Sequence, residues 1–206
     1  GSPFAGLLTA TALMRDVAIL TDATFEEVER SIEKYAAFER EMLPYKRVLD
    51  IWVSRHFGVK HAESFLRLYG SEALQAVVND STRLSPEYRA AIDQTQALWQ
   101  AKRFFHWDLE FPEVFIDLAQ SNWKGNPGFE AVVSNPPYVD VTADTYFQDA
   151  FTCASASNLY AYMLEGSSRL LVRGGRTGMI VPLSLVCSAR MTELRNRLLE
   201  NFSSMR

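Results

Sequence analysis

Four consecutive residues, Asn135-Pro136-Pro137-Tyr138, form the stretch of this sequence best suited to chemistry. The side-chain oxygen of Asn135 and the carbonyl oxygen of Pro136 can each accept one hydrogen of an NH2 group. The ring of Tyr138 offers a face on which a flat heterocycle can stack. Two acceptors on one amine draw its nitrogen towards tetrahedral geometry and free its lone pair for attack. The four residues therefore predict a clamp for a planar group with an exocyclic amine; the alternative is a stiff turn that only ends a strand.

The residues before this loop predict how it is held. Phe129–Val133 is a short run with the composition of a β-strand, and it ends at Ser134. Pro136 and Pro137 exclude both a continuing ladder and an immediate helix. We therefore expect a stiff loop at the carboxyl end of a strand, which is where open α/β sheets place their ligands.

The loop also resembles a known motif, the (Asp/Asn/Ser)-Pro-Pro-(Tyr/Phe/Trp) sequence of the amino-methyltransferases, in its Asn-Pro-Pro-Tyr form typical of N6-adenine DNA methylases. The order FHWDLEFPEVF (105–115), a short Gly/Asn/Pro loop (122–128) and then FEAVVSNPPYV (129–139) is similar to type IIG restriction–modification enzymes and related phage-defence methylases. The segment LPYKRVLDIW (43–52) resembles the helical part that such proteins insert before this point. The resemblance covers most of the chain.

This resemblance implies an adenine-specific DNA methyltransferase that acts in the cytoplasm on DNA, with S-adenosylmethionine as methyl donor and no metal. A flipped adenine would enter the site. Asn135 and Pro136 would hold its amine, Pro137 would complete the motif and Tyr138 would stack on the base. The implied fold class is α/β, with a helical N-terminal segment followed by part of a Rossmann-like methyltransferase sheet. We expect a helical insert or scaffold over 1–104 and the catalytic-loop half of a methyltransferase domain over 105–206.

Apolar spacing predicts helices throughout the first hundred residues. Residues 3–20 are rich in Ala, Leu and Met, and Thr24 and Glu27 form a capping box for the next helix. Its apolar residues recur at spacings of three or four and predict one buried stripe. Pro44 is expected to restart the chain as a separate helix that stops at Gly58. The stripe consists of Phe25, Val28, Ile32, Tyr35 and Phe38.

Further helices are expected at 63–69, at 72–78 and from Ser85 to about Phe104. The aromatic run 104–115 is too apolar to be left in water, so it should pack against a sheet edge or line a pocket. His56 and His61 lack a carboxylate or cysteine cluster beside them and are interpreted as surface or structural residues.

After the loop, the sequence predicts helix, strand and helix. Asn158 is a suitable N-cap for a helix to Val172 that stops at Gly174-Gly175. Residues 176–182 then read as a buried strand ended by proline. The last helix, 188–202, should place Met191, Leu194, Leu198 and Leu199 on one face.

The sequence departs from the family in its glycines. These methylases bind S-adenosylmethionine through a glycine-rich loop after the first strand, where glycine lets the backbone approach the ligand. Before Gly125 the only glycines are at 1, 6, 58 and 70, and no Gly-x-Gly occurs. We therefore expect a fragment of a larger methylase that binds S-adenosylmethionine weakly or not at all and is inactive when isolated.

Composition narrows the remaining alternatives. No apolar run approaches the roughly 18 residues needed to span a bilayer, so no membrane association is expected. The net charge is −4, but residues 169–206 contain seven arginines against two glutamates, which predicts either a phosphate-contacting end or a solvated helical face.

Cys153 and Cys187 follow Thr152 and Val186 rather than a proline, which argues against attack at cytosine C5. Methylation of RNA or of a protein glutamine, and a non-catalytic scaffold role, remain alternatives; the oligomeric state stays open.

Overall fold

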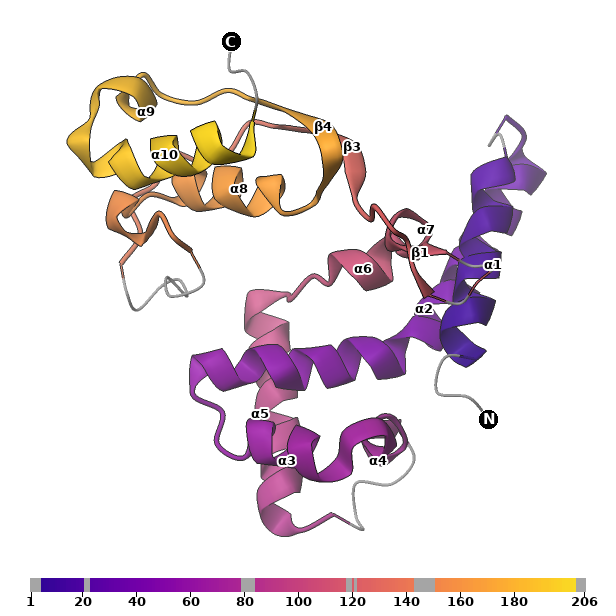
Figure 1. The fold of residues 1–206 in the computed structure, drawn as a ribbon. Helices are drawn as coiled ribbons and strands as arrows, with labels where there is room; N and C mark the ends of the chain where they lie inside the picture. Colours follow the sequence, from indigo (N-terminus) through magenta and orange to yellow (C-terminus); the bar gives the residue numbers. More distant parts are fainter. Residues whose placement is uncertain are drawn as a thin grey trace. The chain divides into compact units, whose positions relative to one another are not determined.

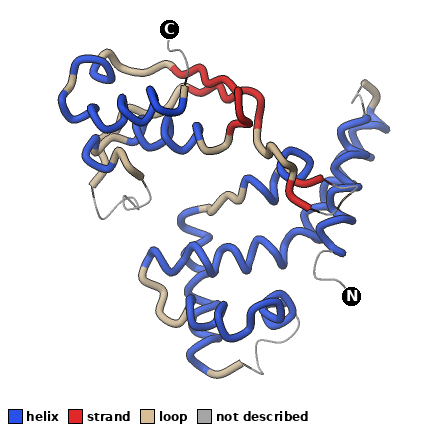
Figure 2. Tube along the Cα trace, viewed as in Figure 1, coloured by secondary structure: helices blue, strands red, loops and turns tan. Residues whose placement is uncertain are grey.

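The structure is a computed structural model that describes residues 5–20, 23–78, 84–117, 120, 122–142 and 151–202. The chain divides into two compact units between Lys124 and Gly125, and each is described by itself. The first is almost entirely helical and the second is α/β, which confirms the predicted fold class (Figures 1 and 2). The proposed functional boundary at 104–105 stays a prediction. Within the described residues, no helix is both long and apolar enough to cross a membrane.

The helical unit is built on one long helix, α2, against which α1, α3, α4 and α5 pack. A two-stranded antiparallel sheet, β1–β2, is the last part of this unit in the sequence and pairs Ile116 with Trp123. The elements are α1 (Ala5–Ile19), α2 (Phe25–Ser54), η1 (Arg55–Phe57), α3 (Ala62–Tyr69), η2 (Gly70–Glu72), α4 (Ala73–Val78), α5 (Pro86–Lys102), α6 (Trp107–Glu110), α7 (Pro112–Phe115), β1 (Ile116–Asp117) and β2 (Asn122–Trp123).

Pro44 lies inside α2 and does not restart the chain, so the predicted break is wrong. An interior proline costs a helix about 3 kcal/mol or more through its missing N–H and its clash with the preceding turn. Here α2 continues because it is fixed on both sides of Pro44: Met42 and Ile51 are fully buried in two different apolar clusters. Tertiary packing therefore overrides the local preference. The predicted cap at Thr24 and stop at Gly58 are confirmed, since Thr24 accepts the amide of Glu27 and Gly58 adopts φ +81°.

The apolar stripe at the start of α2 is not one buried face. Phe38 is fully buried against α1, but Phe25 is 77% and Ile32 63% exposed. The stripe advances by three residues at three of its four steps, so it winds about 140° around a helix of 3.6 residues per turn. A straight partner helix can cover only part of such a stripe, which explains why the prediction fails at its N-terminal end.

The α/β unit is a β–α–β arrangement followed by short helices. Its strands β3 and β4 pair in parallel, and α8 lies between them in the sequence (Figure 1). Its core consists mainly of side chains from α8, the 3-10 turns and α10. The elements are β3 (Phe129–Ser134), η4 (Ala154–Ala156), α8 (Leu159–Ser168), β4 (Leu171–Met179), α9 (Ser184–Cys187), η5 (Ala189–Met191) and α10 (Thr192–Asn201).

Two glycines explain why the predicted boundaries of α8 and β4 are wrong. The helix ends at Ser168 and the strand already begins at Leu171, so Gly174-Gly175 lies within β4 rather than stopping the helix. Between the Phe129–Leu171 and Ala131–Arg176 pairs, β4 advances five residues while β3 advances two. Gly174 takes φ +84° in this irregularity, a conformation that favours glycine.

Burial differs from prediction at the end of the chain as well. The last strand was expected to be buried, but its residues alternate between half-buried and exposed. On α10 and the turn before it, Met191, Leu194 and Leu198 are buried as predicted, whereas Leu199 is 62% exposed.

Candidate active site

The Asn-Pro-Pro-Tyr loop begins where β3 ends, at the carboxyl end of the parallel pair, as predicted. The last ladder pair is Ser134 with Met179, and the amide of Ile180 still donates to the Ser134 carbonyl at 3.3 Å. Beyond this point Pro136 is buried, while Asn135 and Pro137 are exposed. The loop therefore starts on a fixed support and presents the Asn135 side chain outwards.

Tyr138 is held by contacts on two sides. Its hydroxyl donates to the carbonyl of Ile180 at 2.9 Å, just past the end of β4. Its ring meets Tyr160 of α8 edge to face, with centroids 6.1 Å apart and planes at 88°. The side chain nevertheless remains 48% exposed. The arrangement fixes the ring while leaving much of it accessible for stacking.

Asn135 and Tyr138 lie together, but the hydroxyl has only one proton to give. The amide oxygen Oδ1 of Asn135 is 3.3 Å from the Tyr138 hydroxyl, a longer contact than the 2.9 Å to Ile180. The proton is better placed on the Ile180 carbonyl, so Oδ1 keeps its lone pairs for another donor. The structure thus brings together the two side chains that sequence reasoning selected.

The far end of the loop is tied to the start of α8. The carbonyl of Val139 accepts the amide of Leu159 at 2.9 Å, and Asp140 and Asn158 form a β-bridge. Asn158 caps α8 by accepting the Tyr160 amide, and its side-chain nitrogen donates to Asp140 at 3.0 Å. Arg190 adds a 3.3 Å contact to the same carboxylate. Sequence reasoning identified only the cap in this set, because the other contacts are made between segments far apart in the chain.

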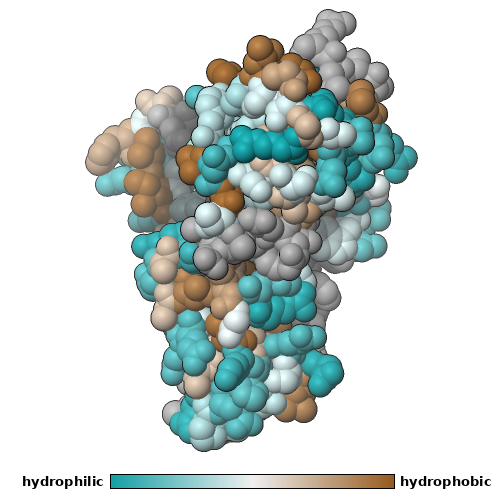
Figure 3. Space-filling view, turned by 90° about the vertical axis from the view of Figure 1, so that its left-hand side faces the viewer, coloured by the Kyte–Doolittle hydropathy of each residue, from teal (hydrophilic) through white to brown (hydrophobic). Residues whose placement is uncertain are grey.

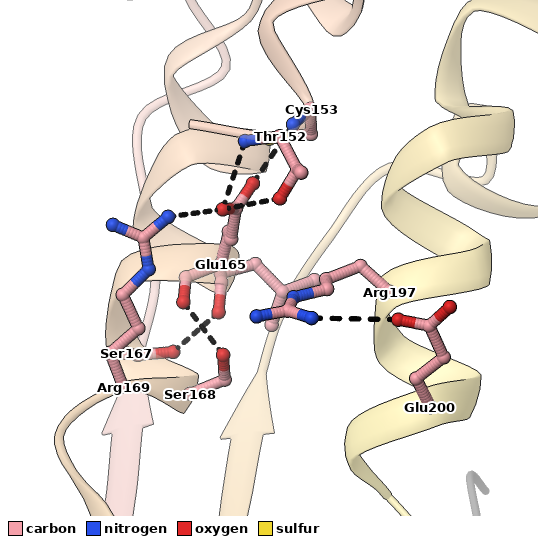
Figure 4. Close-up of polar contacts among 9 residues, drawn as sticks. Thr152, Cys153, Glu165, Ser167, Ser168, Arg169, Arg197 and Glu200 are labelled. Atoms are coloured by element: carbon pink, nitrogen blue, oxygen red, sulfur yellow. Dashed lines mark hydrogen bonds and ion pairs between the residues drawn. The ribbon is translucent and has the colours of Figure 1, made fainter. Parts of the chain in front are cut away.

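A buried carboxylate anchors the segment that precedes α8 (Figure 4). Glu165, 1% exposed, accepts the backbone amides of Thr152 and Cys153 and the Thr152 hydroxyl, and pairs with Arg169. Burial raises the pKa of Glu165, but the hydrogen bonds from Cys153 and Thr152 outweigh it and lower the pKa to about 2. The group is therefore an ionised structural anchor at neutral pH. No sequence signal pointed to it.

Cys153 does not have the properties of an activated nucleophile. Cys153 is fully buried. Burial first, and then the hydrogen bond and charge of Glu165, raise the pKa of its thiol far above the usual range. Cys187 is exposed and donates to the carbonyl of Leu183. A thiolate mechanism finds no support in this geometry.

The α/β unit exposes several large apolar side chains, including those that follow β4. Val133 is 84% exposed, and Ile180, Leu183 and Val186 are each more than 60% exposed. Apolar residues are visible as brown patches on the face of the molecule in Figure 3. In the part of the chain that the structure describes, no cluster of three or more His, Cys, Asp or Glu side chains could hold a metal ion. The loop can hold a planar amine and stack on it, but it has no group placed for metal or covalent chemistry.

The chain was compared with protein families, curated proteins and solved structures. A family model described as Eco57I restriction-modification methylase matches residues 22–205, which extend over both units. No curated protein and no solved structure matches the chain.

Proposed function

Because the chain belongs to the Eco57I restriction-modification methylase family, we propose that it acts in the transfer of a methyl group from S-adenosylmethionine to the N6 amine of adenine in DNA. The observation that supports this proposal most is that the side-chain oxygen of Asn135 is exposed and available as an acceptor. Its side chain is exposed beside Tyr138, and the Tyr138 proton is directed at Ile180 instead of at Oδ1. An acceptor, a stiff backbone and a ring stand together at the carboxyl end of two parallel strands.

In this proposal Asn135 and Pro136 hold the amine and Tyr138 orients the base. The amine donates one hydrogen to Asn135 Oδ1 and the other to the Pro136 carbonyl. Its lone pair, turned away from both acceptors, would form the new N–C bond while the bond from that methyl carbon to the sulfonium sulfur breaks and its electron pair goes to sulfur; one of the amine's protons then leaves to water. Stacking on Tyr138 contributes about 1–3 kcal/mol to holding the base. No general base is needed, which agrees with the lack of a histidine or carboxylate hydrogen-bonded to Asn135 or Tyr138 among the described residues.

S-adenosylmethionine supplies a methyl group on a sulfonium, but the residues described here do not fit a site for it. Binding it through the backbone needs glycines in a turn between a strand and a helix. The glycines with positive φ are Gly58 and Gly70 at helix ends, Gly128 just before β3, and Gly174 within β4. We therefore assign binding of the adenine amine to the described residues, and we do not assign binding of S-adenosylmethionine to them.

Two arginines are candidate contacts for DNA phosphates. Of the arginines in the last third of the chain, Arg169, Arg190 and Arg197 pair with carboxylates, and Arg195 donates to two backbone carbonyls. The remaining described ones, Arg173 and Arg176, are exposed on β4 without a side-chain partner among the described residues. Among the described arginines of this basic region, these two side chains are therefore the ones available to bind a phosphate.

Methyl transfer by the product of the complete reading frame containing this sequence tests the proposal. Replacing Asn135 with Ala should lower the rate by at least about a hundredfold, because one of two acceptors that activate the amine is lost. Asn135→Asp keeps an acceptor and should retain measurable activity. Asn196→Ala, an exposed asparagine on α10, is the matched control and should not change the rate.

The methylated product must be N6-methyladenine by nucleoside analysis. Methylcytosine as the only product, or an Asn135→Ala variant that methylates as fast as the Asn196→Ala control, would exclude the proposal. Circular dichroism of each variant shows whether the fold is kept.

A further inference from the structure

The helical unit contains a cavity of about 360 Å³ between α2, α4, α5 and residues 104–110. Its volume is about ten times the roughly 30 Å³ that one water occupies, and it falls in the range of small-molecule sites. Much of its wall is apolar or aromatic, including Ile92, Trp99 and Phe104. Polar and charged side chains also line it, among them Asp50, His106 and Thr95, so a ligand there meets both apolar surface and hydrogen-bonding groups.

One of the polar groups is a buried histidine whose hydrogen bonding is incomplete. His106 Nε2 lies 2.7 Å from Asp50 Oδ1, and each side chain is only 9% exposed. The second ring nitrogen, Nδ1, makes no hydrogen bond to any residue that the structure describes. His106 is one of the residues that line the cavity, so a ligand there can supply the missing partner of Nδ1. This nitrogen accepts in the neutral ring and donates in the charged ring.

The charges around the cavity do not favour an anion. Lys46 lies 2.8 Å from both Glu39 and Glu110. Burial lowers the pKa of Lys46, but its hydrogen bonds to the two glutamates outweigh this and raise the pKa, so the amine stays charged and compensated. With Asp50 and Arg47, the wall holds three carboxylates, two fixed cations and one histidine. Its net charge is therefore zero or slightly negative.

From this geometry we infer that the cavity binds an uncharged bicyclic heterocycle that carries an N–H donor and a ring-nitrogen acceptor, with His106 Nδ1 as its hydrogen-bond partner. Such a ligand matches either form of the imidazole, since it can both donate and accept. Trp99 and Phe104 supply apolar contacts to its faces. The inference is independent of the proposed function, because all the lining residues belong to the helical unit.

Benzimidazole is the probe, and the full 206-residue chain is titrated near neutral pH by two-dimensional amide and indole NMR. Saturable shifts should centre on Trp99, His106 and Lys46. N-methylindole has the same bicyclic ring frame with one added methyl group, but it has neither the N–H donor nor the basic ring nitrogen, and it should bind at least about tenfold more weakly. Benzimidazole carboxylate should also bind about tenfold more weakly, because three carboxylates against two cations give the wall no net positive charge.

Two pairs of variants separate recognition from folding. Ile92→Trp fills the cavity and should abolish binding, whereas Gln94→Trp, on an exposed position of the same helix outside the cavity wall, should leave it unchanged. The double variant Asp50→Leu/His106→Phe removes the polar pair without leaving a lone charge. It should bind the two uncharged probes with equal affinity, so the selectivity ratio falls to about one.

Lack of saturable benzimidazole binding in the unmodified chain would overturn the inference. So would shifts scattered outside the cavity wall, equal affinity for N-methylindole, tighter binding of the carboxylate, or a selectivity that survives the double variant. If Ile92→Trp does not fold, the selectivity ratio of the double variant decides the question alone.

Discussion

The two candidate sites, one in each unit, place their polar groups in opposite ways. The helical unit buries its Asp50–His106 pair against a cavity wall, with both side chains 9% exposed. The α/β unit presents Asn135 and Tyr138 on an open surface, beside a Val133 that is 84% exposed. A short exposed loop can be recognised from four neighbouring letters, whereas the buried pair joins residues 56 positions apart. The exposed pair is therefore the easier of the two to recognise from the sequence.

The largest effect is expected from breaking the buried pair on one side only. His106→Phe leaves the Asp50 carboxylate buried without its partner and should lower the free energy of unfolding by about 3–5 kcal/mol. The double variant Asp50→Leu/His106→Phe removes both groups and should recover most of that loss. Urea denaturation followed at several probes measures both. Equal losses in the single and double variants would mean that the pair does not act as one unit.

A slightly smaller effect is expected from the anchor of the α/β unit. The folded-state pKa of Glu165, about 2, lies below its ordinary value of 4.5, so the unfolded chain takes up the proton first as the pH falls. Its contribution of about 3 kcal/mol should be complete above about pH 5 and be lost between about pH 5 and 2. Measuring the free energy of unfolding of Glu165→Gln and of the unmodified chain between about pH 7 and pH 2 tests this. The variant should be less stable near neutral pH, and the difference in free energy between the two chains should shrink on acidification. A difference that stays constant with pH would contradict this origin.

The smallest effect is expected at the exposed loop. Tyr138→Phe keeps the stacking face but loses the hydroxyl that donates to Ile180, so methyl transfer should fall about fivefold, as for one hydrogen bond. Tyr138→Ala removes the ring and should reduce the rate by about a hundredfold. Steady-state rates with an adenine-containing duplex measure both. A Phe variant as impaired as the Ala variant would mean that the hydroxyl, and not the ring, is what matters.

Local signals predicted the elements of the fold well where a single segment decides its own structure. The Thr24 cap, the Gly58 stop and the Asn158 cap depend on neighbouring residues and are found as expected. Pro44 shows the limit, because packing on both sides keeps α2 continuous against the preference of the proline itself. Gly174-Gly175 shows a second limit of local prediction. A glycine pair often ends a helix, but this pair lies in the irregular part of the β3–β4 pairing.

The candidate site was predictable in its residues but not in its support. The sequence indicated the positions of Asn135 and Tyr138, because their motif is contiguous. It could not indicate that Ile180, 42 residues further on, receives the Tyr138 hydroxyl. Nor did it indicate Glu165, whose partners Thr152 and Cys153 are brought to it only by folding. The aromatic run is predicted to meet a sheet edge or line a pocket, and Phe104 does line the cavity. His106 belongs to that run, but its partner Asp50 lies on α2, and the sequence does not predict this pairing.

Glu165 also couples the amide hydrogen exchange of Thr152 and Cys153 to the opening of α8. Its side chain receives the amide protons of Thr152 and Cys153, so these protons are protected by a helix to which they do not belong. They should exchange with solvent deuterium only when α8 itself opens, although the residues lie in a turn outside regular structure. One carboxylate should thereby make Thr152 and Cys153 open together with the helix, as parts of one cooperative unit.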